Sequence, residues 1–72
     1  MFKVTRFCVQ PYQWRGVRLV KGDPQQFYTR EEALQAAGTA KRRLACVEVY
    51  EVTGWPVQDI WDRPRLISRA GD

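Results

Sequence analysis

Only one segment of this 72-residue sequence has the pattern of a helix. Any fold of the chain must therefore be built from a single helix and from strands. Thr29, followed three residues later by Glu32, forms a capping box in which the threonine hydroxyl accepts from the Glu32 N–H. The Glu32 side chain reaches back to the N–H of Thr29. The apolar residues after this cap share one stripe at 3.6 residues per turn: Ala33, Ala36, Ala37, Ala40 and Leu44. A single short helix of this kind can lie close to a sheet, but it covers only one of its faces.

Strand-like segments lie on both sides of this helix. They cover residues 2–9, 14–21, 44–52 and 57–62. A loop at residues 11–13 and a turn at Thr53-Gly54 separate the members of each pair, and such short connections predict antiparallel neighbours. We therefore expect an α+β fold in ββαββ order, with a three- or four-stranded, mainly antiparallel sheet and the helix on one face.

The length of the chain allows a single domain. We expect residues 1–62 to form one small α+β domain. Residues 63–72 hold three arginines and little apolar content beyond Leu66 and Ile67, so we expect a basic, flexible tail. The 44% of hydrophobic and 28% of charged residues are typical of a soluble globular protein. No run of about 18 apolar residues is present, and so no membrane association is expected.

The sequence offers little for catalysis. It contains no histidine, the residue most used for acid–base work near neutral pH. Cys8 and Cys46 are too far apart for a C-x-x-C pair, and both lie in apolar runs, so we expect them to be reduced and largely buried in a cytoplasmic protein. The glycines are scattered and the acidic residues have no useful local spacing. We expect no enzyme activity, no catalytic or metal-binding residues, no cofactor and no small-molecule substrate.

The first 22 residues contain five basic side chains and no acidic one. These residues are the candidate nucleic-acid contacts: Lys3, Arg6, Arg15, Arg18 and Lys21. If residues 14–21 form one strand, Arg18 shares a face with Trp14, and a sheet with arginine beside tryptophan can stack bases and bind phosphates. The alternative interpretation is that Trp14 packs at the edge of the core and the arginines are solvated. The basic run at residues 41–43 is interpreted as a complement to the negative end of the helix.

The layout of these elements resembles that of small uncharacterised bacterial domains. The resemblance depends on Trp14 in a strand, on the Thr-x-Glu-Glu-Ala helix start at residues 29–33, and on residues 47–50 in a strand that closes at Gly54. It covers residues 2–62, although Trp55-Pro56 departs from the pattern. The resemblance implies a strand-strand-helix-strand-strand fold and no particular activity.

The face of the sheet without a helix is predicted to be apolar for a wetted surface. Its candidate residues are Trp14, Arg18, Val20, Tyr50 and Val52. We expect a non-enzymatic interaction module that associates with itself or binds a protein through this face or through an edge strand. The alternative is a nucleic-acid-binding module that uses the basic first hairpin and the arginine tail. Convergence of the five cations on one face would favour nucleic acid, and dispersal would favour a protein partner.

Overall fold

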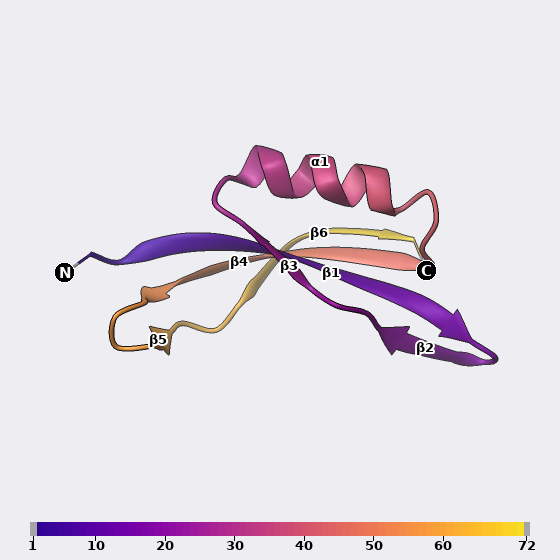
Figure 1. Ribbon diagram of the computed structural model, residues 1–72, viewed down its shortest axis with the longest axis horizontal. Helices are drawn as coiled ribbons and strands as arrows, with labels where there is room; N and C mark the ends of the chain where they lie inside the picture. The colour runs from indigo at the N-terminus through magenta and orange to yellow at the C-terminus, as the bar shows by residue number, and fades with distance from the viewer. Residues whose placement is uncertain (1, 72) are drawn as a thin grey trace.

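A long antiparallel pair of strands forms the centre of the molecule. The computed structural model describes residues 2–71. Strand β1 (Val4–Arg15) pairs with β4 (Cys46–Trp55), and the two run along the longest dimension of the protein, which is 45 Å (Figure 1). Both strands exceed the usual length of five or six residues, so their ends extend beyond the part of the sheet that one short helix can cover.

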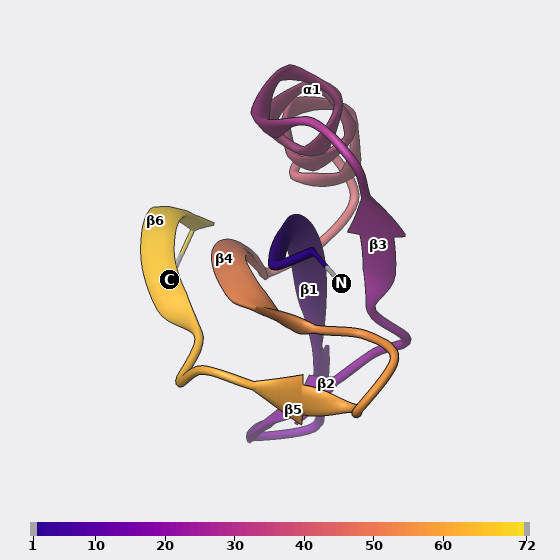
Figure 2. The same ribbon diagram turned by 90° about the vertical axis from the view of Figure 1, so that its left-hand side faces the viewer.

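Four shorter strands complete the sheet on either side of this pair. They are β2 (Arg18–Lys21) and β3 (Gln25–Phe27), which pair with β1, and β5 (Ile60–Trp61) and β6 (Arg65–Gly71), which pair with β4. All the pairings are antiparallel. Figure 2 shows β3 and β6 on opposite sides of the central strands, with the helix above them and with β2 and β5 below. The sheet is therefore strongly curled.

Helix α1 (Arg30–Ala40) lies on one face of the sheet, as the alanine stripe predicts. Its buried residues Ala33 and Ala37 pack in one cluster with alternate side chains of β1 and β4: Phe7, Val9, Val47 and Val49. Because alanine has no side chain beyond Cβ, the helix can approach these strands closely. The α+β class is confirmed, but the sheet has six strands rather than three or four, and the order is βββαβββ rather than ββαββ.

The helix begins where the capping box predicts. The Glu32 N–H donates to Thr29 Oγ1 over 3.2 Å, and the Thr29 hydroxyl donates to Glu32 Oε1 over 2.9 Å. The glutamate therefore accepts from the threonine hydroxyl, whereas the sequence pattern predicts a bond to the backbone N–H. At the other end, Lys41 caps the helix with its backbone N–H on the Ala37 carbonyl.

The expected loop at residues 11–13 is wrong, because β1 continues through Pro11. The Pro11 carbonyl accepts from the Gly22 N–H over 2.9 Å, so the missing proline N–H faces the break between β2 and β3 and removes no bond to β4. The chain reverses instead at Gly16-Val17, where Gly16 has a φ of 62° and Arg15 lies opposite Arg18. The expected strand 14–21 is thus split between two strands.

The expected turn at Thr53-Gly54 is also wrong, because β4 continues to Trp55. The sequence predicts a fourth strand at residues 57–62, and only Ile60–Trp61 pairs with β4. A Cβ on Gly54 would lie 2.8 Å from Trp61 Cα, which is closer than real Cβ atoms come to backbone. Gly54 therefore permits a close approach of two strands and does not form a turn.

The expected flexible tail is wrong for residues 65–71, which form β6 on the open edge of β4. Two arginines of β6 lie directly opposite glutamates of β4: Arg65 opposite Glu51, and Arg69 opposite Glu48. Ile67 packs against the core under the helix. These cross-strand ion pairs and the burial of Ile67 hold a segment whose composition alone suggests disorder. Met1 and Asp72, at the ends of the predicted domain and tail, lie outside the described residues.

The helix cap gives a first prediction. Thr29→Ala should lower the free energy of unfolding by about 1 kcal/mol, because the N–H of Glu32 loses its acceptor. The matched control is Thr39→Ala, since Thr39 lies inside the helix and only donates to the Gln35 carbonyl. Urea denaturation should show the loss for Thr29→Ala alone, and equal losses in both variants would contradict a capping role.

The two glycines of opposite environment give a second prediction. Gly54→Ala should lower the free energy of unfolding by about 2 kcal/mol, because the new Cβ meets the backbone of β5. Gly38→Ala should raise it by up to about 1 kcal/mol, because Gly38 lies within the helix and its Cβ would meet no atom within 4 Å. Thermal and urea unfolding of both variants would test this, and a neutral Gly54→Ala would contradict the close approach.

Candidate interaction face

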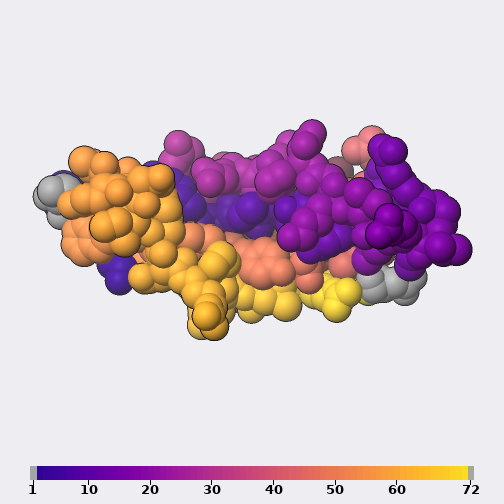
Figure 3. All heavy atoms as spheres, turned by 90° about the horizontal axis from the view of Figure 1, so that it is seen from below, coloured from indigo at the N-terminus to yellow at the C-terminus, as the bar shows by residue number. Residues whose placement is uncertain are grey.

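The face of the sheet opposite the helix is concave. Figure 1 shows β2 and β5 below the central strands at opposite ends of the molecule, and Figure 3 shows the same face seen directly, with β4 between them. A groove of ≈ 240 Å³ lies on this face. Its lining comes from Cys8, Gln10 and Tyr12 of β1 and from Tyr50 and Val52 of β4, together with Lys21 and Pro64. We call this surface the helix-free groove.

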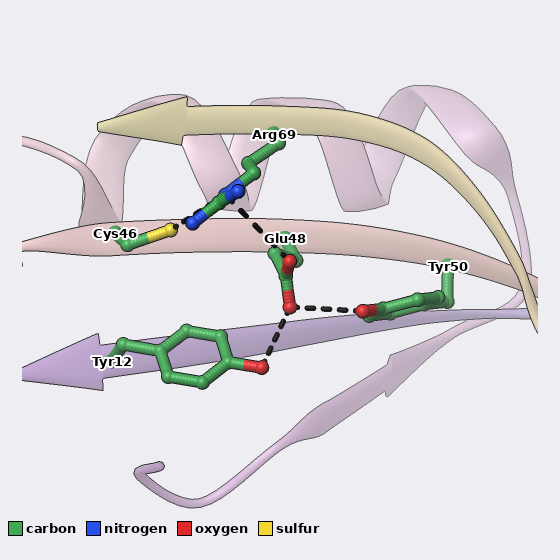
Figure 4. A network of polar contacts seen from close by, with 5 residues as sticks. All are labelled: Tyr12, Cys46, Glu48, Tyr50 and Arg69. Carbon is green, nitrogen blue, oxygen red and sulfur yellow. Dashed lines mark hydrogen bonds and ion pairs between the residues drawn. The ribbon is translucent and has the colours of Figure 1, made fainter. Parts of the chain in front are cut away.

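A carboxylate beside the groove is held by two phenols and one arginine. Glu48 Oε1 accepts from the Tyr12 hydroxyl over 2.6 Å and from the Tyr50 hydroxyl over 2.9 Å (Figure 4). Arg69 Nε lies 3.7 Å from Glu48 Oε2 and donates to Cys46 Sγ over 3.4 Å. The five side chains come from β1, β4 and β6, so the network joins three strands on the face that the helix leaves uncovered.

These contacts hold Glu48 and the two tyrosines each in one protonation state near neutral pH. The hydrogen bond from Tyr12 is the main cause that lowers the pKa of Glu48, and the Tyr50 hydrogen bond and the positive charge of Arg69 act in the same direction. The hydrogen bond to Glu48 raises the pKa of Tyr12 to about 12 and also raises the pKa of Tyr50. Glu48 is therefore an anion and both tyrosines are neutral over the physiological range.

The other polar groups of the groove are also satisfied within the chain. The Gln10 amide donates to the Gly22 carbonyl over 2.8 Å and to the Pro11 carbonyl over 3.0 Å. Among residues 2–71, no buried side-chain nitrogen or oxygen lacks a hydrogen-bond partner. Lys21 also lines the groove, but its side chain is exposed and makes no ion pair within 4.0 Å in the described chain. The groove thus offers apolar contact and one available cation.

The cysteines lie on this same face and are both free. Cys46 is buried as expected, whereas Cys8 is only partly buried and lines the groove, so the expectation of two largely buried thiols is half wrong. Burial raises the pKa of the Cys8 thiol, which disfavours the reactive thiolate. Within the described residues, no three cysteine or acidic side chains gather where they could hold a metal ion.

The structure divides the predicted interaction residues between two faces. Tyr50 and Val52 line the groove, and Trp14 lies on the same side of β1 but past the end of β4. Trp14 pairs with Leu19, so Arg18 and Val20 point to the opposite side. The predicted shared face of Trp14 and Arg18 is therefore wrong, because the turn at Gly16-Val17 changes which side each later residue faces.

Sequence reasoning missed Tyr12 and the role of Glu48. The sequence predicts that Pro11 ends the strand and that Tyr12 lies in a loop, whereas β1 continues to Arg15. The alternation of Cys46, Glu48, Tyr50 and Val52 along one strand is visible in the sequence, and it places a carboxylate on the same face as the groove residues Tyr50 and Val52. A half-buried acidic residue requires partners, and this requirement is the signal that points to a neighbouring tyrosine.

The five predicted nucleic-acid contacts do not converge. Lys3 makes an ion pair with Asp62 over 3.3 Å, and the Arg6 guanidinium lies 4.6 Å from the centre of the Tyr28 ring. Arg15 and Arg18 lie at the tip of the β1–β2 hairpin, at the other end of β1 from Lys3 and Arg6 (Figure 1). Lys21 faces the groove, on the opposite side from Arg15.

No protein-family model, curated protein or solved structure matches this chain. Among residues 2–71, no helix has the length and apolar character needed to cross a membrane.

The Glu48 network gives a third prediction, at alkaline pH. A tyrosine whose pKa is raised in the folded state keeps its proton after the unfolded chain has lost it, so the stability that it contributes is present below pH 10 and is lost towards about pH 12. The free energy of unfolding should therefore fall across this range in the parent protein. Tyr12→Phe should weaken this fall and should cost about 1 kcal/mol at neutral pH.

The control for this prediction is Tyr28→Phe, because Tyr28 is exposed and its ring lies against the Arg6 guanidinium, away from the Glu48 network. Urea denaturation at a series of pH values would separate the two variants. An unchanged alkaline slope in Tyr12→Phe would contradict the assignment of this hydrogen bond.

Proposed function

We propose that this protein is a non-enzymatic interaction module that uses its helix-free groove to bind a protein surface. The observation that carries the proposal is an apolar, concave face whose polar groups are already bonded to one another. Cys8, Val52 and Pro64 give the groove apolar contact area, while the carboxylate of Glu48 is neutralised from within the chain. Apart from the exposed Lys21, a partner can cover such a face without leaving a buried polar group unsatisfied.

The same geometry supports a role without catalysis. A general acid or base works best with a pKa near the working pH. Here the contacts move the pKa of Glu48 down and the pKa of Tyr12 up, away from neutrality in both cases. Cys8 has no histidine to activate it, since the chain contains none, and burial raises its pKa.

We further propose that the occupant of the groove is a second copy of the chain. The two longer dimensions of the molecule, 45 and 23 Å, enclose a face large enough for the roughly 800 Å² per partner that a standard interface buries. Tyr50, Val52, Trp61 and Leu66 would leave water together. Association would also stabilise a domain with a small core, because a partner that binds only the folded state shifts the folding equilibrium.

We also propose that the protein is cytoplasmic. Both cysteines are unpaired in the described chain, which suits a reducing compartment.

Self-association gives the fourth prediction. Val52→Lys places a charge in the groove and should convert a dimer to a monomer in sedimentation equilibrium. The matched control is Leu34→Lys, because Leu34 is a partly exposed residue of the helix on the other side of the sheet. The parent and Leu34→Lys should show unfolding midpoints that rise with protein concentration, and Val52→Lys should lose this dependence.

Two outcomes would contradict the proposal. A parent protein that stays monomeric at millimolar concentration would exclude a second copy as the occupant. A Val52→Lys variant that dimerises as tightly as the parent would show that the dimer uses another surface.

A further inference from the structure

The fold gathers basic residues at one end of the molecule. The C-terminal end of α1 and the tip of the β1–β2 hairpin lie at the same end in Figure 1. The backbone N–H of Ala45 donates to the Tyr12 carbonyl over 3.1 Å and so fixes the segment after the helix beside β1. The basic residues of this end are Arg15, Arg18, Lys21, Lys41, Arg42 and Arg43. None of these six makes an ion pair within 4.0 Å in the described chain.

An exposed tryptophan lies among these cations. Trp14 is 52% exposed and lines a shallow hollow of ≈ 400 Å³ together with Gln13, Arg43 and Ala45. No acidic residue lines this hollow. It therefore combines an accessible aromatic ring, an amide side chain and a guanidinium in one place, and it is separate from the helix-free groove, whose lining shares no residue with it.

The hairpin tip places two positively charged residues opposite each other, an arrangement that a bound anion would stabilise. Arg15 and Arg18 lie directly opposite each other in the β1–β2 pairing. Like charges in such a cross-strand pair destabilise the sheet. Since neither arginine makes an ion pair in the described chain, the repulsion has no internal compensation, and a bound phosphate would supply it.

We propose that this basic end binds single-stranded nucleic acid, with one base stacked on Trp14 and a backbone phosphate bound by Arg43 beside it, and with the strand continuing over the hairpin tip to Arg18 on the other side of the sheet. Single-strand binding combines a cationic surface that follows the backbone with aromatic rings on which bases stack. A half-exposed tryptophan beside the Arg43 guanidinium offers both. This site does not depend on self-association through the helix-free groove, and it uses the basic run at residues 41–43 in place of Lys3 and Arg6.

The first test compares two probes of equal charge. A labelled oligothymidylate of about 12 nucleotides and an abasic oligomer of the same length are titrated by fluorescence anisotropy at about 50 mM salt. We expect the thymidylate to bind about tenfold more tightly, because only it can stack on Trp14. Oligouridylate replaces thymidylate in a parallel titration, and tighter binding of either base-bearing strand than of its abasic counterpart supports the proposal.

The second test uses matched variants to separate stacking from charge. Trp14→Leu should weaken binding about tenfold and leave the salt dependence unchanged. Trp55→Leu should have no effect, because Trp55 ends β4 beside the start of β1, far from Trp14. Arg43→Gln and Arg18→Gln should each reduce the slope of log K against log salt by about 0.7, and Arg30→Gln at the start of the helix should not. The Arg18→Gln variant should bind the oligonucleotide less tightly, while its free energy of unfolding should not fall. A purely structural role for Arg18 would not produce this combination.

Three results would overturn the proposal. The first is a parent protein that binds no oligonucleotide at low salt. The second is equal affinity for the thymidylate and abasic strands with no effect of Trp14→Leu. This result would show that the basic end binds polyanions in general, acidic proteins included. The third is loss of binding in Val52→Lys but not in Trp14→Leu, which would place the contact in the helix-free groove.

Discussion

The structure depends on the packing of one alanine-lined helix against two long strands. Ala33 and Ala37 allow the helix to lie close to β4, where Val47 and Val49 are excluded from water. Only seven hydrophobic residues among residues 2–71 are buried, so this contact supplies much of the apolar burial in the fold. The remaining strands add to the edges of β1 and β4 and derive their positions from that central pair.

A single helix leaves the other face of the sheet without a covering element. On part of that face, Glu48 accepts from two tyrosine hydroxyls and forms an ion pair with Arg69. These partners stabilise the carboxylate, which would be unfavourable in isolation at a half-buried position. The result is an apolar groove with little free charge. Uncompensated cations gather elsewhere, near Trp14. The two surfaces therefore differ in chemistry, and this difference supports separate partners for the face and for the basic end.

Local patterns in the sequence predicted the helix well and the strands less well. The cap at Thr29 and the alanine stripe depend on residues three or four positions apart, so the sequence shows them directly. Pro11 and Gly54 were misread because each is a frequent strand breaker, and its effect depends on the neighbouring strand. Pro11 is tolerated because the position of its missing N–H faces the break between β2 and β3. Gly54 is needed because a Cβ there would meet the backbone of β5.

The sequence by itself determined the fold class, the start and buried face of the helix, and the absence of histidine-based chemistry. Tertiary structure alone decided that residues 65–71 form a strand, since their arginines are stabilised by glutamates about 14 to 21 residues earlier in the chain. It also decided the composition of each face. A two-residue turn at Gly16-Val17 sends Trp14 to one side and Arg18 to the other, because side chains alternate along a strand and the register is set by the turn.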